Sequence, residues 1–295
     1  MKVARILNTP TYIQHPVRHN STRTMLQFFI IVVAGVVLLL FLLWLGLQIR
    51  PAPFPAITLP SGKMETMALP PNLPAPVARF YQKIYGDKIP VIHSAVITGW
   101  ADVRPAGPAY LPARFRFIHD SGKGYRHYIE AGLYGLPLMQ VDERYLDGHA
   151  RGVTPFGVDE GDKVDQAANL GLWAETIWTP AVYLTDPRVQ WQAIDEHTAL
   201  LVVPFREGHD TFIVRFNPET DLIDWVESMR YQNQASPEKI LWLNKAVEWR
   251  DLNGTLTNTI GSAIWMNNGT PWAIFHVDDI RFNVDVNEYI RATGP

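Results

Sequence analysis

The longest apolar run in the chain lies near its start. Residues 25–49 read MLQFFIIVVAGVVLLLFLLWLGLQI, 25 residues without a charged side chain. A helix needs about 20 predominantly apolar residues to cross the hydrocarbon core of a bilayer, so the run predicts a single transmembrane helix. Because it exceeds the roughly 7 to 15 residues of a signal-peptide core and lacks an A-x-A-like exit, we expect an uncleaved signal anchor. A cleaved signal peptide and an internal helix are the alternatives.

Positive charge flanks this run on its N-terminal side. Arg18 and Arg23 precede it, Lys2 and Arg5 lie further back, and residues 1–50 contain no Asp or Glu. Lys and Arg next to a membrane span favour the cytoplasmic side. We therefore predict a single-pass protein of the cell membrane, with residues 1–24 as a cytoplasmic tail and the main domain extracytoplasmic.

Prolines dominate the segment that follows. Residues 51–76 contain eight of them, and each fixes its own φ and removes a backbone donor, which excludes a helix or a central strand. We interpret residues 50–76 as a Pro-rich stalk and residues 77–295 as one extracytoplasmic domain. At about 3.1 Å per residue in polyproline II, such a stalk would lift the domain off the bilayer, unless part of it packs on the domain.

The domain opens with a helical pattern. Apolar side chains recur at the spacing of one helix face, and Gly86 follows the last of them, so the pattern predicts a short amphipathic helix. The residues on that face are Val77, Phe80, Tyr81, Ile84 and Tyr85.

The period then changes to two, which is typical of half-buried strands. Phe115 and Phe117 alternate with arginines in LPARFRFIHD, and DTFIVRFN alternates in the same way before the turn NPETD, which predicts an antiparallel hairpin with the strand at 223–231. Asn268-Gly269 predicts a second hairpin through a type I′ turn, in which both residues have positive φ. Further strands are expected near 92–100, 124–133, 240–250 and 274–286.

One helical segment interrupts the strands. The apolar face of residues 165–185 and the Thr179-Pro180 pair predict a helix, a kink and a second short helix, with Asp162 or Asp165 as the N-cap. No alternating βαβ pattern is present. The predicted fold class is α+β and mostly antiparallel β, a curved sheet packed around one or two helices and preceded by a single transmembrane helix.

Composition and charge exclude several function classes. The chain has no cysteine, so disulfides, thiolate metal sites and a lipid-modified cysteine are excluded. The net charge is −3. Removing the five Lys and Arg of residues 1–50 leaves −8 for the remainder, and this acidic domain without basic runs argues against a nucleic-acid partner.

Motifs for catalysis or metal binding are missing from the sequence. The histidines form no H-x-H or H-E-x-x-H pattern, and His93, His119, His127 and His149 stand at intervals that predict no metal site. The acidic stretch VDEGDKVD departs from a calcium loop and fits a helix N-terminus better. With no G-x-S-x-G or S-x-x-K motif either, we predict no cofactor and no catalytic residue.

Glu175 is the exception, because this carboxylate lies among tryptophans in LGLWAETIWTP. A buried carboxylate needs a partner or a raised pKa, and Arg230 or another strand arginine is a candidate partner. We expect Glu175 either to tie the helix to the sheet or to contact a ligand.

The ten tryptophans and the missing catalytic motifs together favour a noncatalytic, membrane-tethered domain that binds an apolar or amphiphilic ligand, such as a lipid or an acylated partner. An envelope enzyme that uses Glu175 and a structural or assembly module of a membrane complex are the alternatives, and the tryptophans equally fit a packed core. The protein partners stay open. The predicted binding residues are Trp173, Glu175, Trp178, Trp225, Arg230 and Trp265.

The order of several motifs resembles that of an uncharacterised family of bacterial membrane-associated domains of unknown function. The stretches are LPAPVARFY, YLDGHARGV, LGLWAETIWTPAVYL, FNPETDLIDWVESMRY and GSAIWMNNGTPWAIFHVDDIRFNV. The resemblance implies no activity. The pattern is also similar to the lipoprotein-carrier (Lol-type) fold, which implies a curved antiparallel sheet around helices with an apolar cavity. The chain departs from the family pattern at Asp221, where a glycine would favour the turn.

Overall fold

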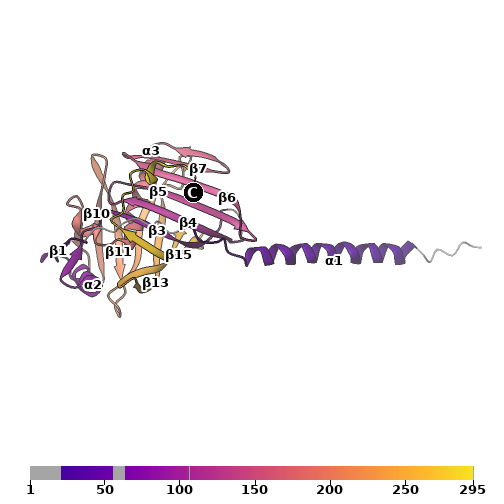
Figure 1. Ribbon diagram of the computed structural model, residues 1–295, viewed down its shortest axis with the longest axis horizontal. Helices are drawn as coiled ribbons and strands as arrows, with labels where there is room; N and C mark the ends of the chain where they lie inside the picture. Colours follow the sequence, from indigo (N-terminus) through magenta and orange to yellow (C-terminus); the bar gives the residue numbers. More distant parts are fainter. Residues whose placement is uncertain (1–20, 56–63, 106, 295) are drawn as a thin grey trace, which may run out of the picture. The chain divides into compact units, whose positions relative to one another are not determined.

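The computed structural model describes residues 21–55, 64–105 and 107–294. The chain divides into two units, residues 1–45 and residues 46–295. The first contains most of helix α1, Ser21–Leu47, which Figure 1 shows as one continuous helix. Within the described residues one helix, Arg23–Leu47, is long and apolar enough to cross a membrane. The predicted apolar helix is therefore present, whereas Lys2, Arg5 and Arg18 lie outside the described residues.

The second unit consists mainly of antiparallel strands. Its helices are α2 (Ala75–Tyr85), α3 (Asp162–Glu175), η1 (Thr176–Trp178), α4 (Val182–Thr185) and η2 (Tyr289–Arg291). Its strands are β1 (Thr66–Ala68), β2 (Lys88–Pro90), β3 (Ser94–Val103), β4 (Leu111–Asp120), β5 (Gly124–Leu133), β6 (Leu136–Leu146), β7 (His149–Thr154), β8 (Gly157–Glu160), β9 (Gln190–Ala193), β10 (Thr198–Phe205), β11 (Gly208–Phe216), β12 (Ile223–Arg230), β13 (Ile240–Leu252), β14 (Thr255–Trp265) and β15 (Pro271–Phe282).

The main sheet has 13 strands in the order β8-β7-β6-β5-β4-β3-β15-β14-β13-β12-β11-β10-β9. Strands β3 to β8 form a meander that runs to one edge, and β9 to β15 form a second meander that runs back from the other edge. The two meanders meet where β15 pairs antiparallel with β3, from Ala273 opposite Val103 to Phe282 opposite Ala95. The predicted mostly antiparallel α+β fold is confirmed.

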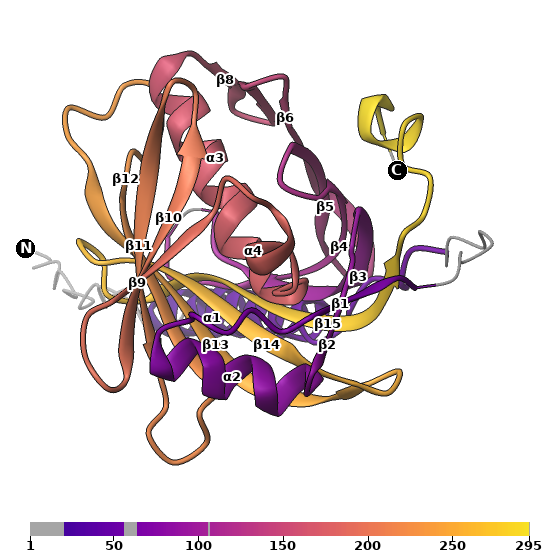
Figure 2. The ribbon, with the colours of Figure 1, turned by 90° about the vertical axis from the view of Figure 1, so that its left-hand side faces the viewer.

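The segment between β8 and β9 crosses the hollow of the sheet. Helix α3 contacts β6, β7 and β8 at one side and β10 and β12 at the other, so the sheet curves around it (Figure 2). Leu170 and Trp173 on α3 are fully buried in the main core. The predicted helix, kink and short helix over 165–185 correspond to α3, η1 and α4.

The strand and the helix that the hydrophobic patterns predict after and before α3 in the sequence are also present. From His209 onward, strand β11 alternates between exposed and buried residues, which is the pattern of a half-buried strand. Helix α2 buries Val77, Phe80 and Tyr81, as the helical spacing predicts, and Phe80 packs edge-on against Trp249 of β13.

The turn residue Asp221 adopts φ 56° in place of a glycine. Its carboxylate accepts a hydrogen bond from Arg79 Nε at 2.8 Å, which compensates for the conformational cost.

Parts of the predicted stalk pack on the domain instead. Phe54 is 6% exposed and lies 5.8 Å from the ring of Tyr128, and Arg116 donates a hydrogen bond to the carbonyl of Pro55 at 2.9 Å. Further along, β1 pairs with β2. Prolines exclude a helix here, but their carbonyls remain acceptors and their extended backbone lies flat on a surface. The described parts of residues 50–76 thus belong to the second unit, residues 46–295.

The predicted N-cap of α3 is wrong. Gly161 occupies that position without a side-chain cap. The Asp165 carboxylate instead accepts a hydrogen bond from the backbone N–H of Ala150 at 2.6 Å, and Arg206 bridges Asp162 and Asp165. The Asp165 carboxylate, which we expected to cap the helix, therefore bonds to the backbone of strand β7.

The predicted type I′ turn at Asn268-Gly269 is also wrong. Gly269 has φ 70°, but Asn268 is not among the residues with positive φ. The connection is longer than two residues, because β14 and β15 pair no further than Ile264 opposite Pro271. Two-residue connections with positive φ at both positions join other strands, at Asp147-Gly148 and Asn253-Gly254.

Replacing Leu170 tests the dependence of the fold on α3. Because its side chain is fully buried in the main core, Leu170→Ala should lower the free energy of unfolding by about 2–5 kcal/mol. Ile194→Ala is the control, since Ile194 is 53% exposed and should cost about 0.5 kcal/mol or less. Urea denaturation of the detergent-solubilised full chain, followed by tryptophan fluorescence, measures both. Equal losses would contradict a core organised around α3.

Candidate functional site

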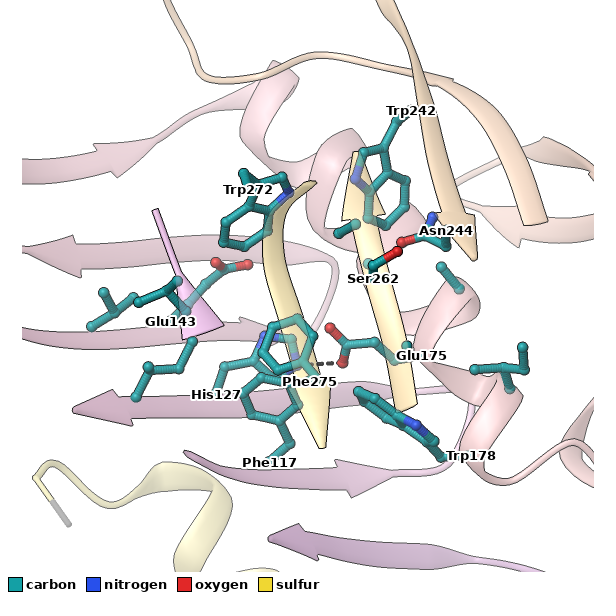
Figure 3. Close-up of a pocket in the computed structure, with 18 of the residues that line it drawn as sticks. Phe117, His127, Glu143, Glu175, Trp178, Trp242, Asn244, Ser262, Trp272 and Phe275 are labelled. Atoms are coloured by element: carbon teal, nitrogen blue, oxygen red, sulfur yellow. Dashed lines mark ion pairs between the residues drawn. The ribbon is translucent and has the colours of Figure 1, made fainter. Parts of the chain in front are cut away.

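A cavity of about 180 Å³ lies between the concave face of the sheet and the C-terminal half of α3. Its walls are contributed by the β3–β6 meander, by strands β12 to β15 and by α3 and η1 (Figure 3). The cavity therefore forms only when the two meanders and the crossing helix are all in place.

Large apolar rings form much of the wall. Phe117 of β4, Trp178 of η1 and Phe275 of β15 pack together, with ring centroids 5.4 Å apart for Phe117 and Phe275 and 6.0 Å apart for Phe117 and Trp178. Trp272 packs edge-on against Phe275, and Trp242 lines the cavity from β13. Figure 3 shows these rings arranged around the space, with the polar side chains of Glu143, Asn244 and Ser262 among them. Such a surface excludes water and favours apolar ligand atoms.

One polar cluster interrupts the apolar wall. The Oε2 atom of Glu175 lies 3.1 Å from His119 Nε2 and 2.6 Å from His127 Nε2. The Glu175 side chain is 20% exposed, and both imidazoles are almost fully buried. In Figure 3 the carboxylate of Glu175 points toward the His127 ring. Two histidines and a carboxylate therefore share one small volume at the cavity.

The register of the β4–β5 hairpin explains why the two histidines meet. Phe117 pairs with His127 and His119 pairs with Tyr125, and directly paired residues lie on the same face of an antiparallel sheet. All four side chains consequently point to the concave side. Glu175 reaches them because it is the last residue of α3.

Electrostatics in this cluster favour the ionised carboxylate and the neutral imidazole. Burial raises the pKa of Glu175, but attraction by His127 and the hydrogen bond with His119 outweigh it and lower the pKa to about 2. Burial lowers the pKa of His119 despite its contact with Glu175. Near neutral pH the cluster therefore contains a charged carboxylate and an uncharged His119.

Arg230 forms a second polar group of the cavity. Its guanidinium lies 4.3 Å from the ring centroid of Trp242 and 5.4 Å from that of Trp265, and Nε donates to the carbonyl of Ala167 at 2.8 Å. Burial lowers the pKa of Arg230, and the nearby Glu143 opposes this shift. Glu143 also accepts a hydrogen bond from the Tyr125 hydroxyl. The cavity wall thus carries Arg230, the carboxylates of Glu143 and Glu175 and the imidazole of His127 among aromatic side chains.

Comparison with known proteins identifies the family. Residues 63–277 match the Family of unknown function (DUF6544). The chain belongs to this family. The predicted resemblance to a family of unknown function is confirmed, and membership assigns no activity. No curated protein matches the chain.

Three solved structures are similar to this DUF6544 chain at low sequence identity. They are a DUF1329 family protein from Desulfovibrio piger (11% identity, TM-score 0.39, covering 66% of this chain and 88% of that one), a putative outer membrane lipoprotein-sorting protein domain from Vibrio parahaemolyticus (8%, 0.39, 66% and 88%) and a LolA superfamily protein from Nitrosomonas europaea (10%, 0.40, 68% and 90%). We carry no function over from them.

Three of the six residues predicted to bind a ligand line the cavity of this DUF6544 chain, namely Glu175, Trp178 and Arg230. Trp265 lies behind the wall, where its ring packs 6.2 Å from that of Trp242. Their role in binding stays a prediction. The expected partner of Glu175 is corrected, because histidines from β4 and β5, not Arg230, contact its carboxylate.

The other two predicted residues lie away from the cavity wall. Trp173 is fully buried in the core and stacks on Tyr183 at 6.5 Å. Trp225 lies on the face of β12 opposite to Val226 and Arg230, where the Lys245 ammonium is 4.9 Å from its ring. Trp173 therefore packs in the core, which was the alternative to ligand binding for the tryptophans.

Sequence reasoning missed Phe117, His127, Glu143, Trp242 and Phe275 as cavity residues. A signal was available for His119 and His127, because the predicted strands LPARFRFIHD and 124–133 are separated by only a short turn. Pairing them as a hairpin places both histidines on one face. Trp242 and Phe275 come from strands far along the chain, and no local pattern indicates that they meet β4.

Arg230 should stabilise the closed cavity. Arg230→Met removes a charged hydrogen bond and a stack on Trp242, so it should lower the free energy of unfolding by about 1–3 kcal/mol. Arg250→Met is the control, because Arg250 is 62% exposed and pairs with Glu248 at the surface, where an ion pair contributes about 0–1 kcal/mol. Equilibrium unfolding in urea compares the two. An Arg230 variant as stable as the control would show that the guanidinium is not part of the packed wall.

Proposed function

We propose that this chain is a membrane-tethered domain that binds the apolar portion of an amphiphilic molecule, such as a lipid or an acylated partner, in the cavity between sheet and helix. The observation that carries the proposal is the cavity itself, about 180 Å³ with a predominantly aromatic and aliphatic wall. An apolar cavity of about 150 Å³ in another protein stays dry and takes up benzene. This space therefore suits several carbon atoms of a chain or ring.

The polar groups of the cavity suit an amphiphile better than a pure hydrocarbon. Arg230 and the cluster at Glu175 lie on the same wall as the aromatic rings. Ligand pockets typically combine apolar walls with a few polar groups that fix orientation. The apolar part of the ligand would pack on Trp178, Phe275 and Trp272, and its polar part would face the charged residues.

The first residues of the folded unit support a membrane location. Gly46 lies in the last turn of α1, and its carbonyl accepts a hydrogen bond from the Tyr134 backbone N–H at 2.9 Å, in the turn between β5 and β6. The same hairpin exposes Leu136 and Leu138, at 67% and 65%. Exposed apolar side chains that neighbour one another are typical of a surface that contacts a membrane or a partner, which supports the anchor interpretation of residues 25–49.

Filling the cavity tests the binding proposal. A Cβ atom on Gly171 would lie 3.5 Å from its nearest neighbour, Tyr125 Oη, which is ordinary contact. Gly171→Leu therefore directs a side chain into the space without a backbone clash. The probe is a doxyl-labelled fatty acid, whose nitroxide quenches nearby tryptophans. We expect the probe to quench the fluorescence of the wild-type full chain and to have little effect on Gly171→Leu.

The control for this experiment is Gln82→Leu, which adds the same side chain to the exposed face of α2 and should retain quenching. Mass spectrometry of organic extracts from the purified wild-type protein provides an independent measurement. Equal quenching in all three proteins, together with extracts that contain no lipid, would count decisively against the binding proposal.

The proposed topology places residues 1–24 in the cytoplasm and the folded unit outside the membrane. In spheroplasts of bacteria that express the full chain, added protease should remove a C-terminal epitope tag and leave an N-terminal tag and a cytosolic marker intact. Alkaline carbonate should leave the protein in the membrane pellet, because a helix of this length and apolarity stays inserted. Protection of the C-terminal tag until detergent is added would overturn the orientation.

A further inference from the structure

We infer that His119, His127 and Glu175 form a binding site for a divalent transition-metal ion such as Zn²⁺, with an open coordination position that faces the cavity. The inference goes beyond the proposed ligand binding and departs from the sequence spacing, which predicted no metal site. It rests on where the fold places three donor atoms.

The donor atoms already converge as a metal site requires. One ring nitrogen of each imidazole and a carboxylate oxygen of Glu175 all lie within 4.8 Å of one another. Ligands about 2.0–2.1 Å from a tetrahedral ion are roughly 3.3 Å apart. The observed contacts of 3.1 Å and 2.6 Å are both shorter than that spacing, so the Glu175 carboxylate would have to rotate away from the imidazoles, mainly from His127, to admit an ion.

Hydrogen bonding accounts for only one side of the cluster, the contact of 3.1 Å between His119 Nε2 and Glu175 Oε2. His127 Nε2 is buried and makes no hydrogen bond with the described residues, although Glu175 Oε2 is only 2.6 Å away. The ring nitrogen therefore approaches the carboxylate without the direction that an N–H···O bond needs. A buried ring nitrogen without a hydrogen bond is costly unless something else satisfies it, and a metal ion would do so.

The surroundings hold the ligands in place. The Tyr125 ring stacks on the His127 ring, with centroids 3.8 Å apart and planes inclined by 10°. The Phe117 ring also packs against His127, with centroids 4.0 Å apart. His119 and His127 stand on adjacent paired strands, and Glu175 ends α3. Since all three supports are regular elements, the donor set is preorganised.

The donor chemistry selects the class of metal. Two imidazoles and one carboxylate suit Zn²⁺ and neighbouring transition metals, whereas Mg²⁺ and Ca²⁺ prefer oxygen ligands throughout. Three protein ligands leave a further coordination position on such an ion. His127 and Glu175 line the cavity, so that position is directed toward the bound molecule or water.

Metal binding to the untagged full chain in detergent tests the inference directly. After treatment with a chelator and dialysis, calorimetric titration with Zn²⁺ should show one ion bound per chain, and Co²⁺ should give the visible absorption of a low-symmetry site with nitrogen and oxygen ligands. Mg²⁺ and Ca²⁺ should not compete. Absence of Zn²⁺ binding by the wild-type chain would overturn the proposal.

Variants locate the ion. His127→Gln and Glu175→Gln should each weaken Zn²⁺ binding by about 10-fold or more, because even outer-shell changes typically cost 10–100-fold. His93→Gln is the control, since His93 is exposed and is not one of the three clustered residues, and it should leave the affinity unchanged. Unchanged affinity in both cluster variants, with circular dichroism showing that they are folded, would assign the ion to another site and sink the proposal.

A second measurement covers the case in which the cluster variants do not fold. Binding to the native state raises the midpoint of thermal unfolding, so Zn²⁺ should raise the melting temperature of the wild-type and His93→Gln chains equally. X-ray absorption of the wild-type Zn²⁺ complex should then show two imidazole ligands. A coordination shell of oxygen atoms alone would contradict the inference. Quenching by the doxyl-labelled fatty acid is measured on the metal-free chain, so that amphiphile binding and metal binding are tested separately.

Discussion

The structure depends on the burial of helix α3 between the two halves of one sheet. The chain leaves the sheet at β8, one edge, and returns at β9, the other edge. The helix must therefore cross the whole concave face. Leu170 and Trp173 of this helix are buried only if strands from both halves of the sheet curve toward it. The pairing of β15 with β3 then joins the two meanders at the centre.

This arrangement also explains why polar chemistry occurs deep in the domain. The C-terminal end of α3 stops beside β4 and β5, which brings the Glu175 carboxylate into an apolar region. A carboxylate in such a place is stable only with partners, and the β4–β5 register supplies two imidazoles. Arg230, held by the Ala167 carbonyl of the same helix, supplies the cation. The helix thus positions the charged groups while the strands supply the aromatic wall.

Much of the fold could be predicted because its signals are local. The alternation around Phe115 and Phe212, the spacing around Phe80 and the break at Pro180 each describe a few turns or one strand. The site was less predictable. Trp178 and Glu175 were identified from the helix alone, but Phe275 meets Phe117 only through the pairing of β15 with β3. Trp225 and Trp173 were assigned to the ligand because composition does not tell which face a tryptophan takes.

Small residues in the sequence help to leave the cavity open, and Gly171 differs in this respect from Gly99. At Gly99 a Cβ atom would come within 1.9 Å of the His276 carbonyl oxygen, so close pairing of β3 and β15 requires glycine there. At Gly171 no such constraint applies, since the nearest atom would be 3.5 Å away. A glycine inside a helix costs about 0.5–1 kcal/mol relative to alanine. No backbone atom crowds Gly171, whose Cβ would meet only side-chain atoms of Tyr125 and Arg230. Together with Ala174 and Gly261, which also line the cavity, it keeps side-chain volume out of this space.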